Sequence, residues 1–385
     1  MIPYGRQDIN QQDIDAVIDV LRSDYLTQGP QVPLFEKTIN EIVKANYSVA
    51  VNSATSALHI ACLALGVGKE DVVWTSPITF VASANCVLYC GASIDFVDID
   101  AATYNLSTVA LEKKLKQAAL ENNLPKVIIP VHLAGQSCDM QKIHQLSLQY
   151  GFNIIEDASH AIGATYQDAP IGNCQYSDIT VFSFHPVKIV TTAEGGIATT
   201  NSSELAQKMQ LLRSHGITRD DSLMTDESHG DWYYQQLELG FNYRMSELHA
   251  ALGISQLKRL EKFVENREAK ATLYNKKLAK LPITLPYQSD STQSSWHLYV
   301  IRLQLDKINK THQTIFNGLR KAGILVNLHY IPVHLQPYYQ KLGFKINDFP
   351  IAEQYYKEAI SIPLFAQLSE SEQNYIIQTL EQLLS

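Results

Sequence analysis

Short apolar runs alternate with segments of helical apolar spacing through the first two thirds of the chain. The apolar runs predict strands at 48–51, 72–74, 93–97, 126–131, 153–156, 178–184 and 195–200. The helical spacing predicts helices at 13–22, 55–65, 82–89, 140–150 and 204–214. Strands that alternate with helices in this way indicate βαβ units, so we expect an α/β fold with a mostly parallel sheet.

The pattern changes after residue 214. Residues 216–236 are polar and irregular, and we predict a surface loop there. One long helix is expected from Ser246 to about Glu268, followed by a smaller α+β unit that opens with 282–286 and a strand at 296–303. A chain of 385 residues is long enough for two domains. We therefore predict a large domain at 1–260 and a small domain at 261–385.

Composition and charge exclude several classes of partner. The formal net charge is -8, which provides no basic face for nucleic acid or for an anionic bilayer. No apolar run approaches the roughly 18 residues that a spanning helix needs, and the N-terminus does not resemble a signal peptide. We expect a cytoplasmic protein that binds neither nucleic acid nor membrane.

The cysteines indicate neither a disulfide framework nor a metal site. Five cysteines in a long chain are too few for a disulfide scaffold. Cys86 and Cys90 could share a helix face, but no second pair of Cys or His stands at zinc spacing near them. We predict buried free thiols and no metal.

The segment N-S-A-T-S-A-L at residues 52–58 places small and hydroxylated side chains at a turn from strand to helix. Backbone N–H groups at the start of a helix have no helical partner and make a natural cradle for phosphate. Ser53 or Thr55 could instead serve only as a helix cap. Neither a Walker loop nor a G-x-G-x-x-G fingerprint is present here.

The apolar strand before E-D-A-S-H-A delivers Asp157 at its C-terminal end. In an open α/β sheet, ligands bind at that end of the strands. A carboxylate in this position could hold a pyridine nitrogen protonated, so that the ring withdraws electrons. Asp157 could also be a simple helix cap, and a metal pair with His160 is less favoured because no third ligand is in view.

Lys188 ends the segment S-F-H-P-V-K, which T-T-A-E-G-G follows closely. No other lysine lies between Lys142 and Lys208. A lysine that directly follows a buried strand is poorly solvated, so it loses its proton more easily and can attack an aldehyde. A surface lysine in a turn is the alternative.

These four motifs, in this order, resemble the sugar aminotransferases of the DegT/DnrJ/EryC1/StrS family. The resemblance runs from L-T-Q-G at residues 26–29 to H-Y-I-P at residues 329–332. It implies the aspartate-aminotransferase (type I) fold, with a large mixed, mostly parallel sheet domain and a smaller α+β C-terminal domain. It also implies pyridoxal 5'-phosphate, with pyridoxamine 5'-phosphate in the cycle. L-glutamate would donate the amino group to a keto sugar carried by a nucleotide.

The resemblance also implies the cofactor contacts. Lys188 would bond covalently to the cofactor and act as base, and Asp157 would pair with the ring nitrogen. His160 would reach the ring hydroxyl, although many relatives have Gln at this position. The other implied contacts are a ring stack by Phe80 and phosphate contacts by Thr55, Ser56, Ser183 and, from the neighbouring subunit, Asn242.

The resemblance further implies a homodimer with a composite active site, in which Asn242 of each chain serves the site of its partner. The implied substrate-binding residues are Tyr4, Thr27, His185, His329 and Tyr330.

Two rival functions remain within reach of the same resemblance. Dehydratases of the family carry His at the position of Lys188, which argues against dehydration. A regulator that binds both this cofactor and DNA is disfavoured by the negative charge and by the absence of a winged-helix or helix-turn-helix segment before the fold.

Overall fold

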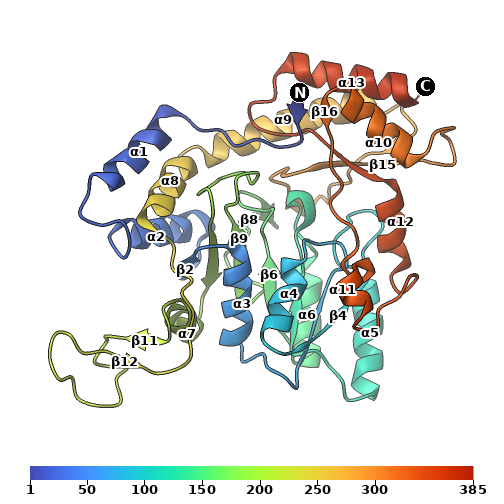
Figure 1. Cartoon of the computed structure of the whole chain (residues 1–385). Coiled ribbons are helices and arrows are strands. Elements are labelled where there is room, and N and C mark those ends of the chain that lie inside the picture. The colour runs from blue at the N-terminus through green and yellow to red at the C-terminus, as the bar shows by residue number, and fades with distance from the viewer. Residues whose placement is uncertain (385) are drawn as a thin grey trace.

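The computed structural model describes residues 1–384, and a seven-stranded sheet lies at the centre of the molecule (Figure 1). All seven strands predicted from the sequence are confirmed as the strands of this sheet. Strand β10 is antiparallel to both of its neighbours, and every other pairing is parallel. In spatial order the strands are β2 (Tyr47–Val51), β10 (Gly196–Thr200), β9 (Ile179–Ser183), β6 (Asn153–Asp157), β5 (Val127–Ile129), β3 (Val72–Thr75) and β4 (Ser93–Phe96).

Helices cover both faces of the sheet, because alternate residues along each strand point to opposite sides. Val49 and Val51 face one apolar core, whereas Ala50 faces the other. The first core contains residues of α3 (Ala54–Ala64), α4 (Ala82–Tyr89) and α7 (Ser203–Arg213). The second contains residues of α2 (Gln31–Val43), α5 (Thr108–Leu120) and α6 (Met140–Tyr150). Apolar burial on both faces explains why the strand sequences are continuous apolar runs.

The single helix predicted from Ser246 to about Glu268 is wrong. The structure has two helices, α8 (Glu247–Leu257) and α9 (Leu260–Leu278), with a break at residues 258 and 259. The guanidinium of Arg259 binds Asp8 Oδ1 at 2.9 Å and Asp13 Oδ2 at 2.5 Å. Asp13 also belongs to the capping box of α1 (Gln11–Leu21), so the break ties α1 to the start of α9.

A smaller α+β unit follows, in which α9, α10 (His312–Lys321) and α13 (Glu370–Leu384) pack with a three-stranded antiparallel sheet. The start of the chain joins this unit, because β1 (Ile2–Pro3) pairs with β16 (Ile324–Leu325). The boundary near residue 260 stays a prediction. The sheet consists of β13 (Ile283–Thr284), β15 (Tyr299–Leu303) and β17 (Ala359–Ile362).

The remaining elements lie around these layers, and some of them contribute residues to the first core. The predicted surface loop at 216–236 projects from the body of the molecule (Figure 1) and contains a short β-hairpin that the sequence did not indicate. No helix among residues 1–384 is long and apolar enough to cross a membrane. The remaining strands and helices are β7 (Thr165–Tyr166), β8 (Ala169–Pro170), β11 (Ile217–Thr218), β12 (Gln235–Gln236), β14 (Thr292–Gln293), α11 (Pro337–Gln340) and α12 (Pro350–Glu358).

Candidate active site

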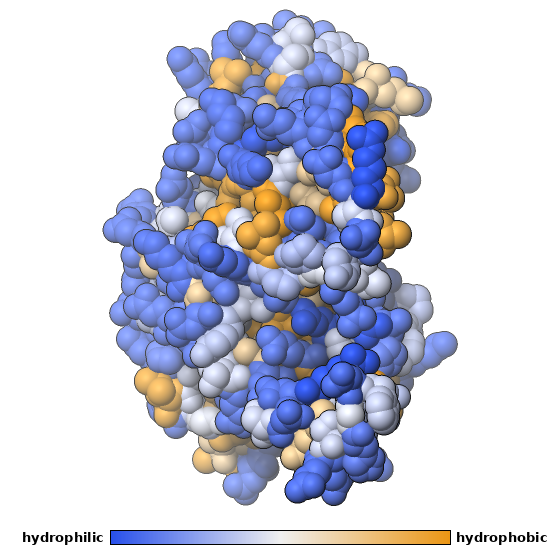
Figure 2. Space-filling view, turned by 90° about the vertical axis from the view of Figure 1, so that its left-hand side faces the viewer, coloured by the Kyte–Doolittle hydropathy of each residue, from blue (hydrophilic) through white to orange (hydrophobic). Residues whose placement is uncertain are grey.

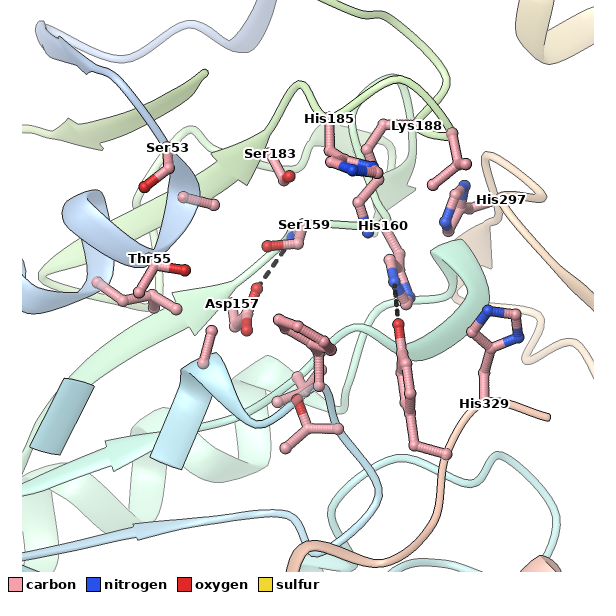
Figure 3. A pocket seen from close by; sticks show the side chains of 18 of the residues that line it. Ser53, Thr55, Asp157, Ser159, His160, Ser183, His185, Lys188, His297 and His329 are labelled. Carbon is pink, nitrogen blue, oxygen red and sulfur yellow. Dashed lines mark hydrogen bonds between the residues drawn. The ribbon is translucent and has the colours of Figure 1, made fainter. Parts of the chain in front are cut away.

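A cavity of about 480 Å³ lies where the C-terminal ends of β6 and β9 meet the starts of α3 and α4 (Figure 3). The C-terminal part of the chain closes it with residues 297 and 327–330. The cavity brings together most of the site residues expected from the sequence. These are Tyr4, Thr55, Phe80, Asp157, His160, Ser183, His185, Lys188, His329 and Tyr330.

Lys188 lies in the segment that connects β9 to β10. Burial lowers the pKa of its amine to about 8, and the negative charge of Asp157 opposes that shift. Within residues 1–384, no hydrogen bond or ion pair engages the amine. An amine with this pKa is about half neutral at pH 8, and the neutral form is the one that attacks a carbonyl or accepts a proton.

Asp157 ends β6 and presents a buried carboxylate to the cavity. Its Oδ2 accepts a hydrogen bond from the Ser83 hydroxyl at 2.6 Å, and its Oδ1 accepts one from the Ser159 backbone N–H at 3.1 Å. Hydrogen bonds to a carboxylate favour its charged form. The arrangement can therefore hold an anion opposite a protonated nitrogen.

The start of α3 forms an anion cradle beside Ser183. Ser53 caps the helix by accepting from the N–H of Ser56, whose own hydroxyl donates to Asn52 Oδ1 at 2.7 Å. The backbone N–H groups of Ala54 and Thr55 have no hydrogen-bond partner among the described residues, as expected at a helix start. A phosphate would satisfy them and interact favourably with the positive end of the helix.

Gly196 permits this cradle to form. A Cβ at Gly196 would lie 2.4 Å from the backbone nitrogen of Ala54 and 2.4 Å from the carbonyl carbon of Ser53. These contacts are with backbone atoms, so the start of α3 would have to move to accommodate any side chain. Glycine at this position therefore sets how closely β10 approaches the cradle.

The opposite wall carries neutral histidines. His160 Nδ1 accepts from the Ala134 N–H at 3.2 Å, so Nε2 carries the ring proton and donates it to the Tyr330 hydroxyl at 3.2 Å. Burial, followed by the positive charge of Lys188, lowers the pKa of His160 well below its usual value and that of His329 to about 3. Burial likewise lowers the pKa of His297, whose ring lies 4.4 Å from His160.

Phe80 offers an aromatic face to the cavity. Its side chain is 58% exposed although it follows a buried strand, and its ring centroid lies 6.2 Å from that of Tyr330. A flat ligand ring could stack on it. At the rim, His185 Nε2 lies 4.0 Å from Glu194 Oε1, and inside the cavity Tyr4 lies beside His329 with ring centroids 5.2 Å apart.

Three expected residues do not line the cavity. The Ser56 hydroxyl is used within the helix cap, Thr27 is exposed between α1 and α2, and Asn242 is exposed before α8. A single chain therefore does not bring Thr27 or Asn242 to the site. Sequence reasoning also missed cavity residues or their supports. Ser159 stood inside the E-D-A-S-H-A motif, whereas Ser83 and His297 carried no local signal. Ser53, which the sequence allowed as a helix cap, is the cap of α3 and also lines the cavity.

The sequence matches the DegT/DnrJ/EryC1/StrS aminotransferase family over residues 7–381. The chain belongs to this family. The UDP-4-amino-4,6-dideoxy-N-acetyl-β-L-altrosamine transaminase of Campylobacter jejuni is 38% identical over 386 residues, which cover 100% of this chain and 98% of the relative. The spore coat polysaccharide biosynthesis protein SpsC of Bacillus subtilis is also 38% identical, over 99% of this chain and 97% of SpsC.

Among solved structures, Spr1654 from Streptococcus pneumoniae in its PMP form superposes with a TM-score of 0.90 at 32% identity, over 100% of this chain and 99% of that one. A PLP form of the same protein superposes with a TM-score of 0.89. The family member described here is a sugar aminotransferase that depends on pyridoxal phosphate. The cavity fits that cofactor, since it combines an anion cradle, a buried carboxylate, an aromatic face and a weakly basic amine.

We predict that Lys188 in the cofactor-free protein is acetylated with a half-maximal rate near pH 8. Asp157→Asn should move this midpoint to lower pH, because the lost negative charge no longer stabilises the ammonium form. Competitive labelling followed by mass spectrometry measures both values. Exposed lysines in the same digest are the internal reference, since ordinary lysines titrate near ~10.4.

Added pyridoxal phosphate should protect Lys188 from the reagent and leave the exposed lysines reactive. The interpretation of Lys188 as an amine with a lowered pKa is wrong if its midpoint coincides with that of the exposed lysines.

We predict that Gly196→Ala weakens binding of pyridoxal phosphate by roughly tenfold or more, because an overpacked contact costs ~1–3 kcal/mol and ~1.4 kcal/mol corresponds to a tenfold change. Titration of the cofactor-free protein, monitored by cofactor absorbance, measures the dissociation constant. Gly68→Ala is the matched control, since a Cβ there meets nothing within 4 Å. Equal affinity in the two variants would contradict the role assigned to the close approach of β10.

Proposed function

We propose that this aminotransferase transfers the amino group of L-glutamate to the C4 keto group of a UDP-linked 4-keto-6-deoxy-N-acetylhexosamine, in pseudaminic acid biosynthesis. The Campylobacter relative, which matches the chain end to end, supports this sugar class. The observation that carries the proposal is the placement of Lys188 and Asp157 in one cavity beside the phosphate cradle.

The proposed cofactor contacts follow from the wall on which each group lies. Thr55, Ser183 and the free N–H groups at the start of α3 would hold the phosphate. Asp157 would face the ring nitrogen, and Phe80 would cover one face of the ring. When bound, the cofactor supplies a carbonyl that stores the amino group between the two half-reactions and a ring that withdraws electrons.

Lys188 has two proposed tasks. Its Nζ would hold the cofactor covalently in the resting enzyme. When released from it, the neutral Nζ would accept the proton from the substrate carbon that bears the nitrogen, and the resulting ammonium would return a proton during transfer. A pKa of about 8 suits both directions, since an amine titrating near the working pH can accept and release a proton.

The cavity wall that carries Tyr330 and the uncharged histidines suits a sugar substrate. Tyr330, His297 and His329 offer phenol and uncharged imidazole groups, which donate or accept single hydrogen bonds. Hydroxyl, keto and acetamido groups are their natural partners. We propose that this wall, with Tyr4, orients the hexosamine so that its keto carbon faces Lys188, and that His185 contacts the substrate at the rim.

The cavity of one chain is short of positive charge for the two proposed substrates. Its lining residues, all within 1–384, include no arginine, and Lys188 is the only lysine. Glutamate carries two carboxylates, and UDP carries a diphosphate. Because such anions are usually paired with cationic side chains, we infer that a second chain supplies part of the site.

We propose that the second chain is another copy that docks on the face containing α1, α2 and α8. An apolar area is visible on this side of the molecule (Figure 2). Leu21, Leu26 and Leu34 are exposed there, and an open groove of about 660 Å³ runs between the three helices. The homodimer would carry Asn242 to the phosphate of its partner, with Thr27 near the partner's substrate.

We predict turnover of UDP-linked 4-keto-6-deoxy-N-acetylhexosamines in preference to dTDP-linked 4-keto sugars and UDP-4-keto-arabinose. Formation of 2-oxoglutarate from glutamate measures the rate, and NMR of the product identifies the aminated carbon. Lys188→Ala should abolish turnover of every sugar. Efficient turnover of dTDP-sugars alone would contradict the proposed substrate and leave the aminotransferase assignment intact.

We predict that Lys188→Ala and Asn242→Asp chains, each inactive alone, recover activity when mixed. A carboxylate at Asn242 would repel the phosphate of whichever site uses it. In a mixed dimer with shared sites, one site carries both changes and the other carries neither, so each mixed dimer should have about half the activity of a normal dimer. Absence of recovery after verified subunit exchange would show that Asn242 serves its own chain.

A further inference from the structure

Two buried hydroxyl groups form a hydrogen-bonded chain that ends at the Asp157 carboxylate. The Ser83 Oγ lies 2.6 Å from Asp157 Oδ2, and the Thr79 Oγ1 lies 2.7 Å from the Ser83 Oγ. Both side chains are almost completely buried, at 0% and 2% exposure. No part of the cofactor chemistry described above uses either residue.

The direction of the two hydrogen bonds follows from their chemistry. An ionised carboxylate can only accept, so the single proton of Ser83 points at Asp157. The other acceptor near Ser83, the carbonyl of Phe80, is more distant at 3.4 Å. With its proton used, the Ser83 oxygen accepts the proton of Thr79. The chain of donors therefore runs from Thr79 through Ser83 to Asp157.

Both hydroxyls come from the turn that leads into α4, which also presents Phe80. The Ser83 N–H donates to the Phe80 carbonyl at 3.2 Å and closes this turn. Phe80 lines the cavity, and the Ser83 hydroxyl donates to the Asp157 carboxylate. Residues 79–83 therefore provide both the aromatic face of Phe80 and the hydrogen bond that orients the Asp157 carboxylate.

We propose that Ser83, supported by Thr79, is a positioning residue that keeps Asp157 charged and oriented toward the ring nitrogen of the cofactor. This inference rests on the role proposed for Asp157. The backbone of Asp157 is already fixed by hydrogen bonds to Pro130 and from His132. Rotation of the carboxylate is limited by two hydrogen bonds, from the Ser159 N–H and from the Ser83 hydroxyl, and the bond from Ser83 is the shorter of the two.

The hydrogen bond from Ser83 also affects how Asp157 shares a proton with the ring nitrogen of the cofactor. A carboxylate and a pyridine nitrogen compete for one proton, and donors to the carboxylate weaken its hold on that proton. Without Ser83, the carboxylate keeps only the Ser159 N–H among the described residues. The proton then shifts from the ring nitrogen toward Asp157, and the ring withdraws electrons less strongly.

Nitrogen NMR of the enzyme loaded with ring-¹⁵N-labelled pyridoxal phosphate tests this directly, together with kcat, KM and the cofactor dissociation constant. The variants are Ser83→Ala and Thr79→Val, the second of which keeps the side-chain shape if the first folds poorly. Ser76→Ala is the matched control. It removes a buried hydroxyl that serves only the Ile78 N–H at 3.2 Å and does not touch Asp157.

Ser83→Ala should move the ring-nitrogen signal toward the unprotonated value and lower kcat about tenfold, as expected for loss of one hydrogen bond to a charged group. KM for glutamate should change less than about twofold. Thr79→Val should shift the same signal less, and Ser76→Ala should leave it in place.

An unchanged ring-nitrogen signal in Ser83→Ala overturns the inference if Asp157→Asn abolishes the protonated signal. If Asp157→Asn also leaves the signal unchanged, the role proposed for Asp157 fails as well.

Discussion

Lys188 is partly buried and lies within the field of Asp157 but, within the described chain, forms no ion pair with it. An ion pair would hold the amine in its charged form, whereas burial far from any anion would depress its pKa much further. The pKa of Lys188, at about 8, lies between these limits. The histidines around Lys188 are neutral for a related reason. Their own burial, and in addition the positive charge of Lys188, lowers the pKa of His160, His297 and His329.

The sheet topology creates this arrangement. Strands β6 and β9 are parallel neighbours in which Asp157 pairs with Val181, so their C-terminal ends reach the same edge. Strand β10 then returns antiparallel beside β9. The connection that carries Lys188, residues 184–195, must turn back and return to that edge. Gly196, where β10 begins, lets the returning strand touch the start of α3, so cradle, carboxylate and amine share one end of the sheet.

The parts of this site that the sequence predicted are those whose signals are local. Asp157 and Lys188 each follow an apolar strand within a few residues, so strand periodicity alone placed them at the correct edge. Ser83 contacts Asp157 across 74 positions, and His297 reaches the cavity from the C-terminal unit, so neither contact leaves a local pattern. The break before α9 was missed for the same reason, since Arg259 binds Asp8 and Asp13 from the other end of the chain.

The electrostatics of Lys188 also bear on where cations for the substrates can lie. An arginine built into the cavity wall would add a second fixed positive charge and lower the pKa of Lys188 further, since like charges disfavour the ammonium form. The ammonium form is needed to return a proton. Cations carried on a second chain, at the rim and screened by the substrate's own negative charges, avoid this conflict. The absence of arginine from the lining within residues 1–384 is therefore consistent with the demands on Lys188, and the proposed composite site would meet both requirements.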